Sequence, residues 1–98
     1  MTPSSMTLTE LLATGRKIWG EEPYDRMVLR DIVYCLGVVF GDICRATRDG
    51  DPELLKKEFG NLLLSTVRWM DDLGLDIGEC LKLAERAQRD WAERRRLK

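Results

Sequence analysis

Residues 49–76 read DGDPELLKKEFGNLLLSTVRWMDDLGLD, a helical segment enclosed by two turn signals. Asp51 followed by Pro52 predicts a helix start, because aspartate accepts a hydrogen bond from an orphan backbone amide and proline tolerates the first helical position. Gly74 predicts the end, since glycine readily adopts the left-handed conformation that closes many helices. We therefore expect a helix from residue 52 to about residue 73. Its predicted inner face consists of Leu55, Phe59, Leu62, Leu63, Thr66, Val67 and Met70.

The segment before this helix, from Pro23 to about Arg48, predicts one long helix, because its apolar residues recur at three-four spacing. The β-branched and aromatic run 32–40 is also compatible with a buried strand, and glycines within it weaken a helix. The length of the segment and the lack of a hairpin partner favour the helix. Its middle is apolar on nearly every side, so we expect it to be covered in a bundle or a subunit interface. The residues predicted at an oligomer interface are Val33, Leu36, Gly37, Phe40 and Gly41.

The N-terminal part of the chain carries the capping-box pair Thr7 and Glu10. This pair predicts a first helix over about residues 7–19, ended by Gly20 and Pro23. The side chains predicted to face inward are Leu8, Leu11, Leu12, Ala13, Ile18 and Trp19.

A second capping-box pair, Asp76 and Glu79, predicts a fourth helix after Gly74. The inner face of this helix follows a regular helical spacing and includes Trp91 as a core residue. Its predicted members are Ile77, Cys80, Leu81, Ala84, Ala87, Gln88 and Trp91.

Four helices with short connections predict an all-α fold, a single four-helix bundle over residues 1–98 with frayed ends at 1–6 and 93–98. A chain of 98 residues builds only a small core, so we expect a homodimer or tetramer. With 16 basic and 17 acidic residues, no overall charge attracts the chain to nucleic acid or to an anionic membrane.

The cysteine and histidine content limits the kinds of disulfide, metal site and catalytic site that the chain can form. Three cysteines without metal-ligand spacing predict reduced core residues rather than a disulfide framework. Without histidine, nucleophiles paired with imidazole and the common zinc sites are excluded, so catalysis would need carboxylates. No leader and no span of about 18 apolar residues is present, and we expect a soluble cytoplasmic protein.

Four motifs together resemble the MazG-like nucleotide pyrophosphohydrolases, a small all-helical family. They are Leu8-Thr9-Glu10-Leu11 with Trp19, Gly50-Asp51-Pro52-Glu53, Glu58-Phe59-Gly60-Asn61, and Leu73-Gly74-Leu75-Asp76. The resemblance covers nearly the whole chain and implies a four-helix MazG-like bundle. In the family, a Glu-Glu-x-x-Glu cluster and a Glu-x-x-Asp motif on the next helix hold Mg²⁺ against a nucleoside triphosphate.

The acidic motif of that family is degenerate in this chain. Glu58 and Asn61 match Glu-x-x-Asp, with an amide in place of the second carboxylate. The glutamate cluster can be aligned in two registers: it falls on Tyr34, Cys35 and Val38, or on Val38, Val39 and Asp42. The resemblance therefore implies at most a weak Mg²⁺ site formed by Asp42, Glu58 and Asn61.

Simpler roles compete with each of these residues. Asp42 precedes Arg45 by three positions and Glu58 follows Lys56 and Lys57, so surface ion pairs would explain both acids. The other candidate features have structural explanations as well. We expect Asp71 and Asp72 on the solvated surface, and the basic end Arg94-Arg95-Arg96 at a helix dipole rather than on nucleic acid. Trp69 lies off the main apolar stripe of its helix and is the tryptophan to test for a partner surface.

Three functions remain open at this point. The first is a catalytically degenerate MazG-like domain that acts as an oligomeric nucleotide-binding or protein-interaction module. The second is a Mg²⁺-dependent nucleoside triphosphate pyrophosphohydrolase that draws its carboxylates from Asp42, Glu58 and also Asp31 or Glu53. The third is a helical adaptor outside the family, which would not respond to nucleotide.

Overall fold

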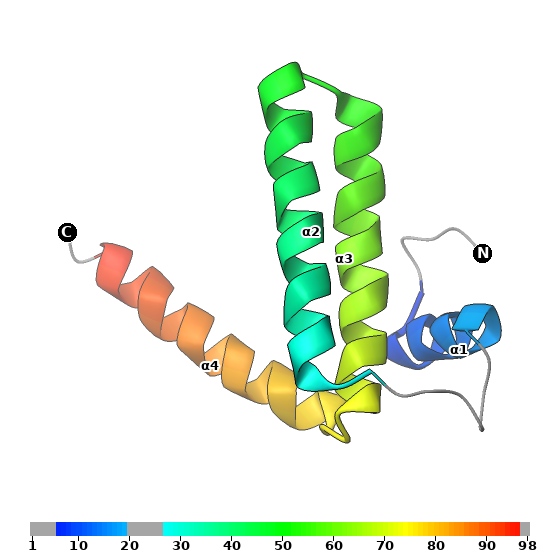
Figure 1. Ribbon diagram of the computed structural model, residues 1–98. Helices are drawn as coiled ribbons and strands as arrows, with labels where there is room; N and C mark the ends of the chain where they lie inside the picture. The colour runs from blue at the N-terminus through cyan, green and yellow to red at the C-terminus, as the bar shows by residue number, and fades with distance from the viewer. Residues whose placement is uncertain (1–5, 20–26, 97–98) are drawn as a thin grey trace.

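The computed structural model describes residues 6–19 and 27–96, which fold into four α-helices (Figure 1). The described ranges contain no strand, so the all-α prediction is confirmed and the strand alternative for residues 32–40 is wrong. The helices are α1 (Leu8–Trp19), α2 (Leu29–Asp49), α3 (Pro52–Asp72) and α4 (Ile77–Arg96). The predicted start of the second helix, 23–26, lies outside the described residues, and α2 begins at Leu29.

Helices α2 and α3 form an antiparallel hairpin whose turn was correctly located from the sequence. Gly50 takes the left-handed conformation with φ 64°, and the Asp51 amide donates to the Ala46 carbonyl at 3.0 Å. The Asp51 carboxylate then accepts from the Leu54 amide at 3.1 Å and caps α3. One turn therefore satisfies the polar backbone groups of both helix ends.

The core lies along the line where α2 and α3 face one another. Ile32, Val39 and Ala46 recur every second turn of α2 and are buried there, and α3 buries Trp69 on the face that also carries Glu58. Val67 is buried as well, but it lies about 160° round α3 from Trp69, on another side of that helix. Trp69, the candidate for a partner surface, is only 8% exposed and is a core residue instead. Phe59 and Leu63, predicted on the inner face of α3, are exposed instead.

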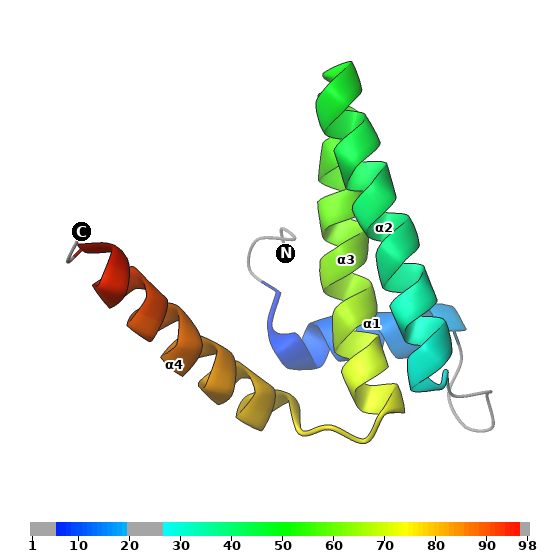
Figure 2. The same ribbon diagram turned by 60° about the vertical axis from the view of Figure 1, so that its left-hand side comes forward.

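Helix α1 crosses the lower part of α3 (Figure 2). Its capping box forms as predicted, since the Glu10 amide donates to the Thr7 hydroxyl and the Thr7 amide donates to the Glu10 carboxylate, each at 3.2 Å. Gly15 is buried at the crossing, where a Cβ would lie 3.7 Å from the Cβ of Arg68. Trp19 and Ile18, expected to face inward, are exposed.

Helix α4 points away from the hairpin and contacts only α3 among the described helices, near the Leu73–Asp76 connection (Figures 1 and 2). None of its residues is buried, and Trp91 is 57% exposed. The predicted inner face is therefore uncovered within one chain, which corrects the assignment of Trp91 to the core. The radius of gyration reflects this shape: it is 15.7 Å, against about 12.6 Å for a compact chain of this length.

The C-terminal helix extends further than predicted. Helix α4 continues to Arg96, past the point at which we expected fraying. Residues 1–5 and 97–98 lie outside the described ranges. Among the helices that the structure describes, none combines the length and apolar character needed to cross a bilayer.

Candidate functional site

The hairpin brings Asp42 and Glu58 to the same level of the α2–α3 contact. Asp42 lies on the stripe of α2 that buries Val39 and Ala46, and Glu58 lies on the facing stripe of α3. The two acids are equally far along the chain from Gly50, so an antiparallel hairpin places them opposite one another. Glu58 is 3% exposed, which makes it a buried carboxylate in the middle of a helical contact.

Asn61, the third predicted metal ligand, is not brought to this pair. It is exposed on α3, and its amide oxygen accepts a hydrogen bond from the Ser65 hydroxyl at 3.3 Å. Residues three apart on a helix are neighbours, yet here Glu58 points into the hairpin while Asn61 lies on its surface. The predicted ligand set is thus divided between the inside and the outside of the hairpin.

Each acid already has a cationic neighbour on its own helix. The Arg45 guanidinium donates to the Asp42 carboxylate, and the Lys57 ammonium lies 3.7 Å from Glu58 Oε1. The predicted ion pairs are confirmed, but the one at Glu58 is not a surface pair, because the carboxylate side of it is buried. Both carboxylates therefore have their charge partly offset without a metal ion.

The positions aligned above with the glutamates of the resembled family do not form an acidic site. Cys35 and Val39 lie on the inner stripe of α2, whereas Tyr34 and Val38 are exposed. In the described ranges no group of three Cys, Asp or Glu side chains is arranged to hold a metal ion. The hairpin is lined by apolar groups on the face where the family would carry acids.

The additional carboxylates that a pyrophosphohydrolase would need lie apart from Glu58. Asp31 is exposed at the start of α2, where the Arg30 Nε lies 4.0 Å from its Oδ1. Glu53 is exposed at the start of α3, where the Lys56 ammonium lies 3.2 Å from its Oε1. Neither acid lies at the level of the hairpin that Asp42 and Glu58 share.

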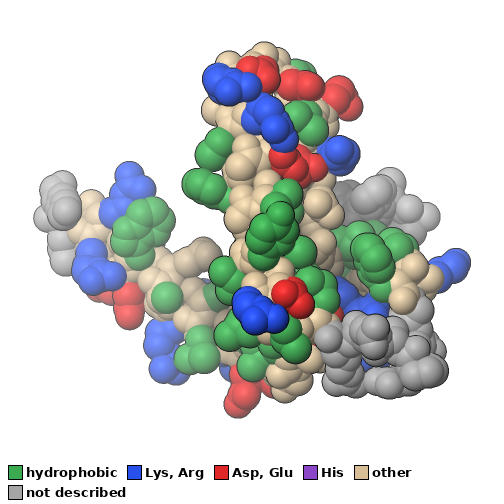
Figure 3. Space-filling view, in the orientation of Figure 1, with side chains coloured by type: hydrophobic (Ala, Val, Ile, Leu, Met, Phe, Trp, Pro, Cys, Tyr) green, Lys and Arg blue, Asp and Glu red, His purple; other side chains and the backbone are tan. Residues whose placement is uncertain are grey.

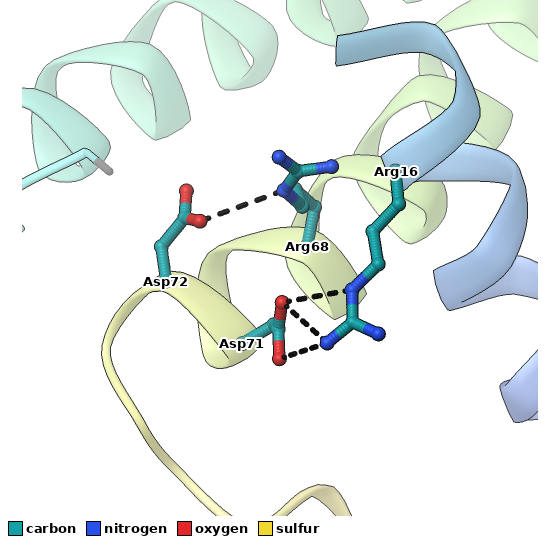
Figure 4. Close-up of polar contacts among 4 residues, drawn as sticks. All are labelled: Arg16, Arg68, Asp71 and Asp72. Carbon is teal, nitrogen blue, oxygen red and sulfur yellow. Dashed lines mark hydrogen bonds and ion pairs between the residues drawn. The ribbon is translucent and has the colours of Figure 1, made fainter. Parts of the chain in front are cut away.

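An ion-pair cluster that sequence analysis missed joins α1 to the lower end of α3 (Figure 4). Arg16 makes a two-pronged contact with Asp71, and Arg68 pairs with Asp72 at 3.5 Å. The side chains of the second pair are only 6% and 4% exposed, so Asp71 and Asp72 are not solvated surface residues as predicted. The four-residue spacing of Arg68 and Asp72 was a usable signal, whereas nothing local indicates that Arg16 reaches Asp71.

The outer face of α2 carries the residues predicted at an oligomer interface. Val33 and Phe40 are 57% and 69% exposed, and Leu36 is 38% exposed. Between them, a Cβ added to Gly37 or Gly41 would meet nothing within 4 Å. Figure 3 shows hydrophobic side chains along the middle of the hairpin and charged ones gathered at its tip. One chain therefore leaves this apolar face open.

The cysteines are free thiols but not core residues as predicted. Cys35 and Cys80 are half-buried and Cys44 is exposed. Cys44 follows Phe40 and Gly41 on the same outer face of α2, one turn further along. A free cysteine at this position behaves as a small apolar side chain with a weak donor.

Comparison of the chain with protein-family models, with curated proteins and with solved structures gave no match. The assignment to the MazG-like family thus remains a prediction that rests on the turn and helix motifs.

Proposed function

We propose that this chain is a MazG-like helical domain that has lost its metal-dependent chemistry and works as a self-associating interaction module. The observation that carries the proposal is the uncovered outer face of α2, where Val33, Leu36 and Phe40 meet solvent. Single exposed apolar residues are ordinary, but a contiguous apolar face on the longest helices of a small domain is typical of an interface.

Burial of this face against a partner is energetically favourable. Full burial of a large apolar side chain contributes about 1.5–3 kcal/mol. Val33, Leu36 and Phe40 are partly exposed, so covering all three would contribute about 2.5–5 kcal/mol per chain before association entropy is subtracted. Gly37 and Gly41 leave space for a second helix to approach closely. We therefore expect a homo-oligomer, a dimer or a tetramer.

The scarcity of carboxylates in the α2–α3 contact argues against strong metal binding. Magnesium bound to phosphate requires several hard oxygen ligands, and only Asp42 and Glu58 share a level of the hairpin. Each of them has a cationic neighbour, Arg45 or Lys57, which competes with a metal ion for the carboxylate. Binding of a nucleoside triphosphate by this module would then be weak and would depend little on Mg²⁺.

Sedimentation analysis over a range of protein concentrations tests the proposed association. The wild-type chain is expected to associate, and Phe40→Asp to weaken association at least about tenfold, since a charge is placed in an apolar contact. Ile18→Asp is the matched control: Ile18 is also exposed and apolar, but it lies on α1. A wild-type chain that stays monomeric at about 100 μM would contradict the proposal.

The second candidate function is a Mg²⁺-dependent pyrophosphohydrolase that releases a nucleoside monophosphate and pyrophosphate. It is favoured by one observation, the burial of Glu58 opposite α2, because buried carboxylates are frequent at functional sites. Pyrophosphate release measured across all NTPs and dNTPs with Mg²⁺ or Mn²⁺ decides between the two. Turnover that disappears in Glu58→Gln would replace the first proposal with the second.

Thermal unfolding with and without nucleoside triphosphates separates the MazG-like module from an unrelated helical adaptor. A ligand that binds the folded state raises its apparent stability, by about 2.7 kcal/mol at one hundred times its Kd. We expect a small shift with triphosphates that is similar in the presence and absence of Mg²⁺. An unchanged transition at millimolar triphosphate would favour the adaptor.

A further inference from the structure

Helix α4 carries a second uncovered apolar face. Its stripe holds Leu81 and Trp91, 45% and 57% exposed. A shallow open depression on the same helix is lined by Leu81, Ala84, Gln88 and Ala92 and, at its edge, by Glu85 and Arg89. The Arg95 guanidinium lies 5.2 Å from the Trp91 ring centroid, which covers only one side of the indole. An amphipathic helix of this kind derives most of its stability from packing against another element.

The connection between α3 and α4 fixes the direction in which α4 leaves the hairpin. Gly74 has φ 71°, and the Leu75 amide donates to the Met70 carbonyl at 2.9 Å, which closes α3. Asp76 then caps α4, accepting from the Glu79 amide at 3.3 Å. At this connection α4 leaves the hairpin and contacts only α3 among the described helices, so the described part of the same chain leaves the apolar stripe of α4 uncovered.

The two helices that carry these faces are similar in length. Helix α4 has 20 residues and α2 has 21, which corresponds to about 30 Å for each helix. The apolar stripe of α4 is bordered by charged side chains, whereas residues 32–41 of α2 include no charged residue. Each chain therefore has two uncovered apolar faces, the stripe of α4 and the outer face of α2.

We propose that α4 of one copy packs on the outer face of α2 of a second copy, and that the exchange is reciprocal in a two-fold symmetric dimer. This inference rests on the proposed self-association and names the element that makes the contact. Two identical contacts of this kind close the assembly, so neither of these two faces is left to recruit further copies.

The accessible surface of the chain is consistent with such an exchange. The chain exposes 8011 Å², whereas a compact monomer of this mass exposes about 5,700 Å². The excess of about 2,300 Å² per chain comes from the whole chain and not only from α2 and α4. It is larger than the roughly 800 Å² that each partner contributes to an interface of standard size, so enough surface is open for such a dimer.

A complementation experiment with two variants tests the exchange. Phe40→Asp damages the surface on α2, and Leu81→Asp damages the helix that docks on it. Each variant alone has two damaged contacts and is expected to be monomeric. In an equimolar mixture, α4 of the Phe40→Asp chain can dock on α2 of the Leu81→Asp chain. Native mass spectrometry with one chain isotope-labelled should then detect a heterodimer.

Leu83→Asp is the matched control, because Leu83 is exposed on α4 but lies off the apolar stripe. It is expected to dimerise within about threefold of the wild-type affinity, since surface substitutions change free energies by roughly 0.5 kcal/mol or less. Circular dichroism of all variants confirms that α4 stays helical.

The remaining outcomes overturn the exchange in distinguishable ways. If Leu81→Asp alone dimerises like the wild type, the interface joins hairpin to hairpin and only the exchange fails. If Phe40→Asp alone dimerises, α4 pairs with another α4 or with a different surface. A mixture that yields no heterodimer also refutes the exchange, and a monomeric wild-type chain refutes both the exchange and the proposed self-association.

Discussion

Arg16 of α1 donates hydrogen bonds to the carboxylate of Asp71 of α3 from two nitrogens of its guanidinium group. Nη2 lies 2.9 Å from Oδ1 and Nε lies 3.3 Å from Oδ2. This fork-to-fork geometry sets both the distance and the rotation between the two helices. Together with Gly15 against Arg68, it explains how the short helix α1 is held across the lower part of α3 (Figure 4).

The first prediction concerns this contact. Arg16→Met keeps most of the aliphatic side chain and removes the three charged hydrogen bonds to Asp71, so the free energy of unfolding should fall by about 1 kcal/mol. The loss is limited because the Arg16 side chain is 41% exposed and water screens the pair. Urea unfolding of a double-mutant cycle with Asp71→Asn measures it, and strictly additive effects would contradict the coupling. Arg30→Met, on an exposed pair, serves as the control.

The second prediction concerns the buried pair. Asp72→Asn leaves the Arg68 cation buried with its carboxylate partner neutralised, and should destabilise the fold by about 3 kcal/mol or more. The combined variant Arg68→Met/Asp72→Leu should recover most of this loss, because well-packed apolar groups can replace a buried ion pair. Thermal unfolding followed by circular dichroism measures both. A combined variant less stable than Asp72→Asn would show that the pair has a further role.

The third prediction uses the glycines. Gly50 and Gly74 have φ values of 64° and 71°, so alanine at either position should destabilise the fold by about 1–2 kcal/mol. Gly60 lies inside α3, where a Cβ would meet nothing within 4 Å. Gly60→Ala should therefore stabilise the fold by about 0.5–1 kcal/mol. Opposite signs in urea unfolding are the expected result, and a neutral Gly50→Ala would argue against the cap.

The fourth prediction separates two tryptophans. Trp69→Ala should lower unfolding free energy by about 3–5 kcal/mol, because it removes a buried ring from the hairpin contact. Trp91→Ala should change it by no more than about 0.5 kcal/mol when measured below the concentration at which the chain associates. If both substitutions are equally damaging in dilute protein, α4 packs in the core of its own chain.

The ends of the helices could be predicted well from the sequence, because each is fixed by a few adjacent residues. Thr7 with Glu10, Asp51 with Pro52, and Gly74 all act where they were expected. The pairing of α2 with α3 also followed, since a tight turn leaves two helices little choice but to lie antiparallel. The apolar stripe of α2 was found for the same local reason.

What could not be predicted depends on contacts between distant segments. Periodicity showed that α4 has an apolar face, but not whether the same chain covers it. Asp71 was assigned to solvent because its partner Arg16 lies on another helix. Trp91 was assigned to the core and Trp69 was the candidate for a partner surface, whereas the structure buries Trp69 and exposes Trp91. The reason is that burial depends on which helices pack against a face, and spacing within one helix does not show this. The level shared by Asp42 and Glu58 required the hairpin itself.

The four residues that connect α3 to α4 determine where the last helix can pack. Their two caps make this link short and stiff, so its length sets where the last helix can reach. A flexible glycine-rich insertion after Gly74 would let that helix swing back onto its own hairpin. A change confined to one surface loop could thereby convert an assembly into an independent unit without altering a single interior side chain.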